Sequence, residues 1–167
     1  MHRSVLVETG GYDGDVLFEN LELLRTVESV GGWVDHAPGI AVSRRPPTVR
    51  HFMGQRVRQA YDDLAEPARL ARELAILPVL ALASRRPALL ALVAAAVVGL
   101  AELGRRRAGF EDVPRDAPLW APLWVLERGV CVWVALTLRL TGGMPYAGTR
   151  IVRAASSRRD LAAKEGR

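Results

Sequence analysis

Residues 10–23 read GGYDGDVLFENLEL, and residues 55–59, some way downstream, read QRVRQ. In the first stretch a glycine pair permits a loop with positive φ, and the aspartates that follow it can cap a helix. Leucines then recur at helical spacing as far as Gly31-Gly32, where the helix is expected to end. The two stretches therefore predict a pair of helices that carry the functional side chains of residues 1–67.

The first of these helices has an apolar and a polar arc. At about 100° per residue its leucines fall on one arc, whereas Glu22 and Arg25 fall on the other. We expect the apolar arc to pack against the protein, with Asn20 inside it and Glu19 at its edge. An unpaired buried amide costs roughly 1–3 kcal/mol, so Asn20 is either a hydrogen-bonded core amide or part of a site.

A second helix is expected from Val49 to Glu66, because apolar residues recur there at helical spacing and Pro67 interrupts the pattern. Gln55 and Arg58 lie one turn apart on a different face, so an amide and a guanidinium can address one ligand together. A planar guanidinium suits phosphate, or the charge that develops on a departing diphosphate. Between the two helices, residues 39–43 suggest a short strand.

A GGY loop, an E-N-x-E-L segment and a Q-x-x-R motif ahead of apolar helices together resemble the C-terminal part of a membrane-bound family 2 glycosyltransferase with the GT-A fold. The resemblance covers residues 4–61 well and the apolar remainder in general character only. It implies an acceptor loop at Gly10, Gly11 and Tyr12, with Gln55 and Arg58 closing over donor and acceptor at the membrane face. The fold expected for the chain is mainly α: the truncated C-terminal portion of an α/β GT-A domain, followed by membrane or interfacial helices.

Two positions depart from the family pattern. The family's general base is an aspartate where this chain has Asn20, and an amide cannot take a proton at neutral pH. The resemblance then implies that Asn20 orients the acceptor and that Glu19, Asp15 or Glu22 acts as the base, so Glu19, Asn20 and Arg58 are the candidate catalytic residues. The tryptophan of the family motif is Gln59 here, which removes a stacking surface and argues against a processive polysaccharide synthase.

The nucleotide-binding half of such an enzyme, with its metal-binding D-x-D, is missing from this sequence. Asp13-Gly14-Asp15 follows the glycine pair instead of preceding it, which favours a helix cap or an acceptor-loop role over a metal site. Cys131 is the only cysteine and the three histidines are not at ligand spacing, so no metal site is expected in this chain. A divalent cation, Mg²⁺ or Mn²⁺, is implied only for the complete enzyme.

Composition indicates a membrane surface as the setting. The chain has 23 Lys+Arg against 18 Asp+Glu, a net charge of +5, and half of its residues are hydrophobic, many of them after residue 73. The positive charges are scattered and lack interleaved aromatic residues, so nucleic acid is not expected as a partner. An anionic membrane surface fits better, and membrane lipid is the expected partner.

Five segments follow from these patterns. A membrane helical hairpin is expected to turn at Arg85-Arg86, and Glu127-Arg128 splits the next apolar run, which is therefore either paired inside a bundle or interfacial, with the interfacial reading favoured. The segments are an acceptor-side remnant of a GT-A domain (1–67), the hairpin (68–104), a linker (105–117), an interfacial or third membrane helix (118–146) and a polar basic tail (147–167).

The sequence thus predicts part of a glycosyltransferase of the cell membrane, with its N-terminal part and its tail in the cytoplasm. It would move a sugar from a nucleotide-sugar donor to a lipid or membrane-associated acceptor. We expect the chain to be inactive alone and to meet a nucleotide sugar only with the missing half, which either upstream coding sequence or a separate polypeptide would supply. The alternative is a non-enzymatic membrane protein or remnant that binds a partner.

Overall fold

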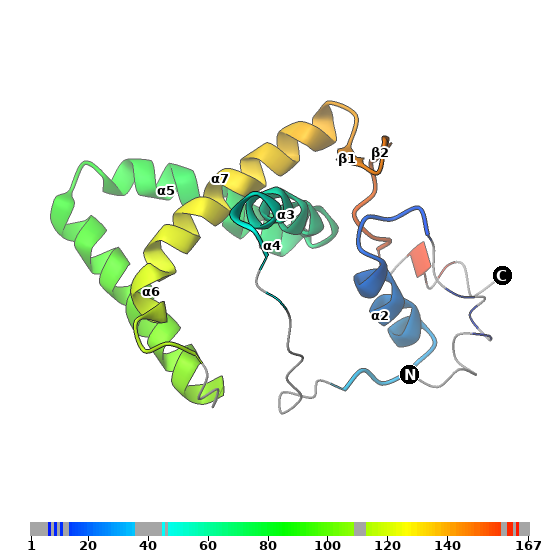
Figure 1. The fold of residues 1–167 in the computed structure, drawn as a ribbon, viewed down its shortest axis with the longest axis horizontal. Helices are drawn as coiled ribbons and strands as arrows, with labels where there is room; N and C mark the ends of the chain where they lie inside the picture. The colour runs from blue at the N-terminus through cyan, green and yellow to red at the C-terminus, as the bar shows by residue number, and fades with distance from the viewer. Residues whose placement is uncertain are drawn as a thin grey trace. The chain divides into compact units, whose positions relative to one another are not determined.

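A computed structural model describes residues 7, 9, 11, 14–35, 45, 47–108, 113–157, 160, 161 and 163 of the chain. The described part is mainly helical, as expected, and its one sheet is a two-stranded hairpin (Figure 1). Its elements are α2 (Glu19–Ser29), α3 (Val49–Tyr61), η1 (Asp62–Ala65), α4 (Pro67–Leu74), α5 (Ile76–Ala83), α6 (Pro87–Ala108), η2 (Ala117–Trp120), α7 (Ala121–Leu140), β1 (Met144–Tyr146) and β2 (Thr149–Ile151). The strand expected at residues 39–43 lies outside the described residues.

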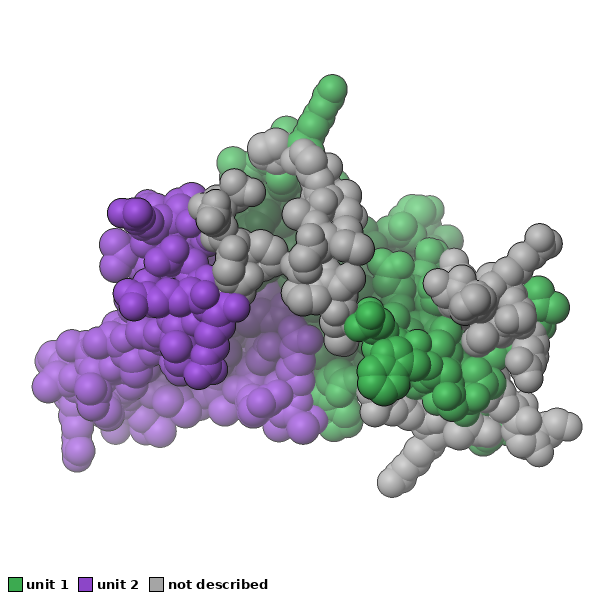
Figure 2. All heavy atoms as spheres, turned by 90° about the horizontal axis from the view of Figure 1, so that it is seen from below, with its two compact units in different colours: residues 1–67, 135–167 green, residues 68–134 purple. Residues whose placement is uncertain are grey.

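The chain divides into two compact units, which Figure 2 colours separately. Unit 1 combines residues 1–67 with residues 135–167, and unit 2 comprises residues 68–134. The end of the chain therefore belongs to the same unit as its beginning. The segment expected as a polar basic tail (147–167) contributes Ala154, Ala155 and Leu161 to the buried residues of unit 1.

Helix α2 ends where the sequence predicts but begins later than expected. Gly31 has φ +76°, and the N–H groups of Gly31 and Gly32 donate to the carbonyls of Glu28 and Val27 at 3.1 and 2.9 Å. This Schellman arrangement satisfies carbonyls that the helix leaves open, and glycine adopts its left-handed turn without steric cost. At the other end the cap is Phe18, with no side-chain cap bond, so the expected cap at Asp13–Asp15 is wrong.

Helix α2 buries most of the polar arc that its leucines leave over. Glu22, Arg25 and Thr26 are buried together with Val27, whereas Leu24 is exposed. Glu22 Oε2 accepts from the N–H of Ser156 at 2.6 Å, and Arg25 Nη1 donates to the carbonyl of Ser156 at 2.6 Å. The two side chains thus bind both polar groups of one residue from the C-terminal segment, which makes a polar helix face the packed one.

The C-terminal hairpin supplies a second link within unit 1. Strands β1 and β2 pair antiparallel across Ala147 and Gly148, both with positive φ, the geometry of a two-residue type I′ turn. Just beyond β2, the carbonyl of Val152 accepts from the hydroxyl of Tyr61 at 2.8 Å. Tyr61 is fully buried at the end of α3, and burial raises the pKa of its phenol. The hairpin therefore anchors the end of α3.

In unit 2 a proline creates a hydrogen-bond acceptor for a tryptophan. Pro78 lies in α5 and has no N–H, so the carbonyl of Leu74 four residues earlier loses its helical donor. The indole Nε1 of Trp133 on α7 donates to that carbonyl at 3.2 Å. Gly129 on the same helix has no side chain where Ile76 lies: a Cβ there would be 2.8 Å from Ile76 Cγ2. Helices α5 and α7 therefore approach closely.

The charges in the middle of α7 have partners. Arg128 forms an ion pair with Glu73 of α4, and Glu73 also accepts from Arg69 Nε at 3.1 Å. Cys131, buried as expected for a small hydrophobic residue, places its Sγ 3.0 Å from Glu127 Oε1. Both charges that split this apolar segment therefore have a partner within unit 2.

Among the residues that the structure describes, two helical segments are long and apolar enough to cross a membrane. They are Pro87–Arg107 and Ala117–Leu140, and the share of the apolar window that the protein itself buries is 0% in the first and 22% in the second. The core helix of a soluble protein would bury most of such a window. Lipid is one covering that suits the large apolar surface that these helices leave open.

Candidate functional site

The polar face of α3 forms a basic hollow. Thr48 caps the helix, with its Oγ1 3.3 Å from the backbone nitrogen of His51, and the helix then presents residues three, four and seven positions apart on one side. The hollow has a volume of about 410 Å³. Its lining residues are Thr48, Arg50, His51, Gly54, Gln55 and Arg58. Gln55 and Arg58 thus share one surface, as their spacing predicts; we call it the α3 hollow.

Arg58 is positioned by a residue from the far end of the chain. Its guanidinium carbon lies 4.4 Å from the ring centroid of Tyr146 on β1, a cation–π contact. Arg58 is half-buried, and its Nε is shielded from solvent without a hydrogen-bond acceptor among the described residues. The ring therefore holds the guanidinium in place while leaving donor capacity for a ligand.

The α3 hollow is electrostatically suited to an anion. Arg50 and Arg58 are cations, and none of the six lining residues is acidic. The N-terminal end of α3, which Thr48 caps, adds the positive potential of the helix dipole. Arg56, by contrast, does not line the hollow: its Nη1 donates to Gln59 Oε1 at 2.7 Å and its guanidinium lies 5.6 Å from the Phe52 ring.

The other candidate catalytic residues lie on α2. Glu19 and Asn20 are both exposed in its first turn, so the expectation that Asn20 lies on the packed face is wrong. Among the described residues, no hydrogen bond, ion pair or hollow joins Glu19 or Asn20 to the α3 hollow.

Of the three carboxylates considered as a base, Glu22 does not fit that role. It is fully buried and its Oε2 accepts from the backbone of Ser156, so it holds unit 1 together. Asp15 and Glu19 are exposed. Gly11 has φ +87°, the left-handed conformation expected for the acceptor loop, whereas Gly10 and Tyr12 lie outside the described residues.

The residues that the structure describes do not offer a metal site. No group of three or more His, Cys, Asp or Glu side chains converges among them, and Asp13 of the D-x-D pair is not one of them. The cation implied for the complete enzyme therefore has no set of ligands in the described part of this chain. Comparison of the chain with protein families, with curated proteins and with solved structures gave no match.

Several residues of the site were not found by sequence reasoning. Thr48 is a typical N-cap residue, and it directly precedes the start of the helix. The sequence could therefore have placed the basic residues that follow it in the first turn of that helix. Tyr146 was not, because its contact with Arg58 depends on a hairpin distant in sequence. The signal for that hairpin is Ala147-Gly148, a short turn ending in glycine between two short extended runs.

Proposed function

We propose that this chain is the acceptor-side, C-terminal part of a membrane glycosyltransferase that moves a sugar from a nucleotide-sugar donor to a lipid or membrane-associated acceptor. The observation that carries the proposal is the α3 hollow, in which Gln55 and Arg58 are joined by Arg50 and His51 with no carboxylate. Such a surface suits a diphosphate, which needs several donors and little competing negative charge. The donor domain would come from a separate half.

The proposed residues divide the chemistry between them. In the transfer, the bond between the anomeric carbon of the sugar and the diphosphate oxygen breaks, and an acceptor hydroxyl oxygen bonds to that carbon. Glu19 takes the hydroxyl proton, and Asn20 orients the acceptor through its amide. Gln55 and Arg58 stabilise the negative charge that accumulates on the departing diphosphate. A divalent cation belongs to this proposal only in the complete enzyme, and no step here depends on it.

The setting proposed for this reaction is the cytoplasmic face of the cell membrane. Two apolar helical segments of the described part are long enough to cross a bilayer, and a lipid acceptor would be presented at its surface. Membrane retention alone would also suit the non-enzymatic alternative, a membrane protein that binds a partner. The α3 hollow supports the enzymatic proposal, because its lining of donors without a carboxylate suits a diphosphate.

The test uses membranes from cells that express the chain in its native genetic context. Labelled nucleotide sugars are supplied, and label in the lipid-extractable fraction is measured for the wild type, Arg58→Ala, Arg58→Lys and Arg56→Ala. Arg58→Ala should lower transfer roughly a hundredfold or more, because removing one preorganised donor costs about 3–4 kcal/mol in the transition state. Lysine should restore activity only partly, because it cannot reproduce the planar fork.

Arg56→Ala is the matched control, since it removes the same charge from the same helix outside the α3 hollow. Its transfer rate should stay within about threefold of the wild type, the range expected for a surface charge. Equal and mild effects of both substitutions would reject the catalytic reading of α3. Unchanged labelling after deletion of the chain would favour the non-enzymatic alternative. The purified chain alone should show no saturable nucleotide-sugar binding by calorimetry.

A further inference from the structure

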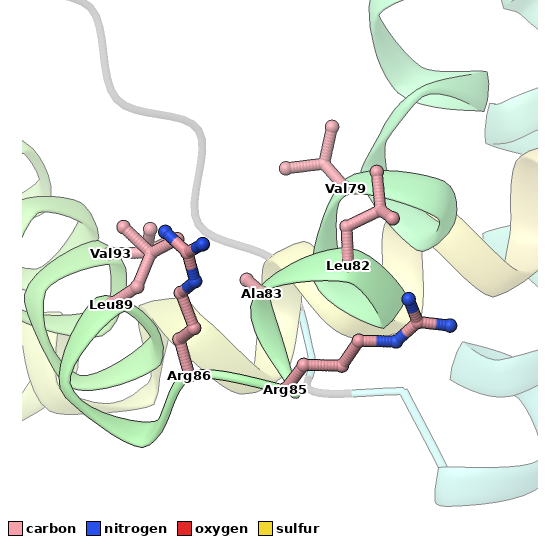
Figure 3. Close-up of a pocket in the computed structure, with 7 residues that line it drawn as sticks. All are labelled: Val79, Leu82, Ala83, Arg85, Arg86, Leu89 and Val93. Atoms are coloured by element: carbon pink, nitrogen blue, oxygen red, sulfur yellow. The ribbon is translucent and has the colours of Figure 1, made fainter.

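A second hollow lies where α5 turns into α6, in unit 2. Val79 and Leu82 from α5 and Leu89 and Val93 from α6 line it, and Figure 3 shows these side chains on either side of the turn. Arg85 and Arg86, in the turn itself, complete the lining residues that matter here. Its volume is about 490 Å³. We call it the α5–α6 groove; it shares no residue with the α3 hollow.

The apolar walls of this groove are not packed against the protein. Val79 is 53% exposed and Leu82 is 66% exposed, although both are fully apolar. Burying apolar side chains stabilises a protein by about 25 cal/mol for each Å² of surface removed from water. The exposed parts of these two side chains do not contribute that stabilisation. Two helices thus present an apolar surface that only an apolar ligand or solvent can fill.

The arginines at the turn differ from most others in unit 2. Arg69, Arg105, Arg106 and Arg128 each form an ion pair with a carboxylate on their own or a neighbouring helix. Neither Arg85 nor Arg86 forms an ion pair or a side-chain hydrogen bond with any residue that the structure describes, and both are exposed. Two uncompensated guanidinium groups therefore flank an apolar groove. In Figure 3 the Arg86 guanidinium lies beside Leu89 and Val93, and the Arg85 side chain extends along the other side of the turn.

We propose that the α5–α6 groove binds an anionic phospholipid. One acyl chain would lie against the apolar walls, and the guanidinium groups would donate to the phosphate of the headgroup. Helix α6 begins at Pro87, directly after the turn, and its apolar run is long enough to cross a bilayer. A spanning α6 would place Arg85 and Arg86 at headgroup depth, where each basic side chain adds to the attraction for anionic lipid.

Both halves of the groove are needed to specify this ligand. A free phosphate would use the arginines but not the apolar walls, and an apolar peptide would use the walls but not the arginines. A zwitterionic lipid would fill the walls without offsetting two positive charges. The inference rests on membrane insertion of α6 and not on sugar transfer, so it can fail while the proposed function stands.

The experiment measures lipid binding to the full chain in nonionic detergent. A phosphatidylglycerol labelled on its tail is titrated with protein, and fluorescence anisotropy gives the apparent Kd. Phosphatidylcholine with identical tails is the comparison lipid and should bind at least tenfold more weakly. Arg85→Ala/Arg86→Ala should weaken phosphatidylglycerol binding roughly thirtyfold, about fivefold for each basic residue near an anionic headgroup. Circular dichroism checks that each variant keeps its helix content.

Two further variants separate a lipid site from general charge attraction. Arg107→Ala/Arg115→Ala removes the same charge from unit 2 outside the groove and should leave the Kd within about twofold, as for other exposed charges. Val79→Trp fills the apolar wall without changing charge and should weaken binding at least fivefold. Equal losses in both arginine pairs would overturn the proposal. Undiminished binding by Val79→Trp, or complete displacement of the lipid by inorganic phosphate, would show an anion site only and would also overturn it.

Discussion

The ion pair between Glu73 and Arg128 should be the most costly polar contact to break in unit 2. Their side chains are 15% and 14% exposed, so both charges are largely withdrawn from water. Breaking a buried pair by removing one partner costs about 3–5 kcal/mol, and the residual exposure places this pair at the lower end. We therefore expect Glu73→Leu to lower the free energy of unfolding by roughly 3 kcal/mol.

The two partners should not be equivalent. Glu73 also accepts from Arg69 at 3.1 Å, so it keeps this cation when Arg128 is replaced, whereas replacing Glu73 removes the carboxylate from both arginines. Arg128→Met should then cost about 1.5–2 kcal/mol, and the double variant Glu73→Leu/Arg128→Met only about 1 kcal/mol, because neither charge of the buried pair remains. The corresponding coupling energy of the double-mutant cycle is roughly 3.5–4 kcal/mol.

The assay is reversible unfolding of the full chain in mixed micelles, with the denaturing detergent titrated in and the tryptophan fluorescence of α7 as the signal. Arg69→Met is the control, because Arg69 is 48% exposed and its pair with Glu73 lies on one helix. It should cost less than about 0.5 kcal/mol. If Glu73→Leu costs no more than this control, or if the double variant costs the sum of the single ones, the reasoning is wrong.

Three further predictions test the membrane assignment and the packing of each unit. The chain should remain in the membrane fraction through high salt and alkaline carbonate, and recovery in the soluble fraction without detergent would contradict its membrane assignment. Gly129→Ala should destabilise unit 2 by about 1–3 kcal/mol in the same unfolding assay, because its Cβ would lie 2.8 Å from Ile76 Cγ2; no loss would mean that α5 and α7 are not in close contact. Burial raises the pKa of Tyr61, so the folded state holds the phenol proton more tightly than the unfolded state does. This contribution to the free energy of unfolding is fully present below the pKa of an unfolded tyrosine, near 10, and should be lost as the pH rises through the pKa of the folded state. Tyr61→Phe should abolish this loss of stability at alkaline pH, and it should cost about 1 kcal/mol at neutral pH because the hydrogen bond to the Val152 carbonyl is lost. If the variant loses stability at alkaline pH as the wild type does, another group is responsible for that loss.

The sequence by itself determined the features that depend on nearest neighbours. Gly31 ends α2, Thr48 begins α3, Pro67 separates η1 from α4, and Pro87 begins α6, each through a backbone preference that acts within one helical turn. That Gln55 and Arg58 line one hollow follows in the same way, because positions i and i+3 are neighbours on the surface of any α-helix. Apolar length likewise identified the membrane-capable helices.

Only the tertiary structure decided which face of each helix is packed. The leucines of α2 point to one burial face, yet Glu22 and Arg25 are buried because the backbone of Ser156 offers them a donor and an acceptor from the far end of the chain. Periodicity weighs side chains by polarity and cannot register a distant partner that satisfies a polar group.

The same reason explains the contacts of Arg58 and Arg128. Tyr146 positions the first and Glu73 pairs with the second, and in each case the partner belongs to an element remote in sequence. The sequence placed Arg58 on a polar face and left Arg128 between two arrangements, because local chemistry states only that a charge needs a partner. Chain folding selects the partner, through the β-hairpin for Arg58 and through the packing of α4 and α7 for Arg128.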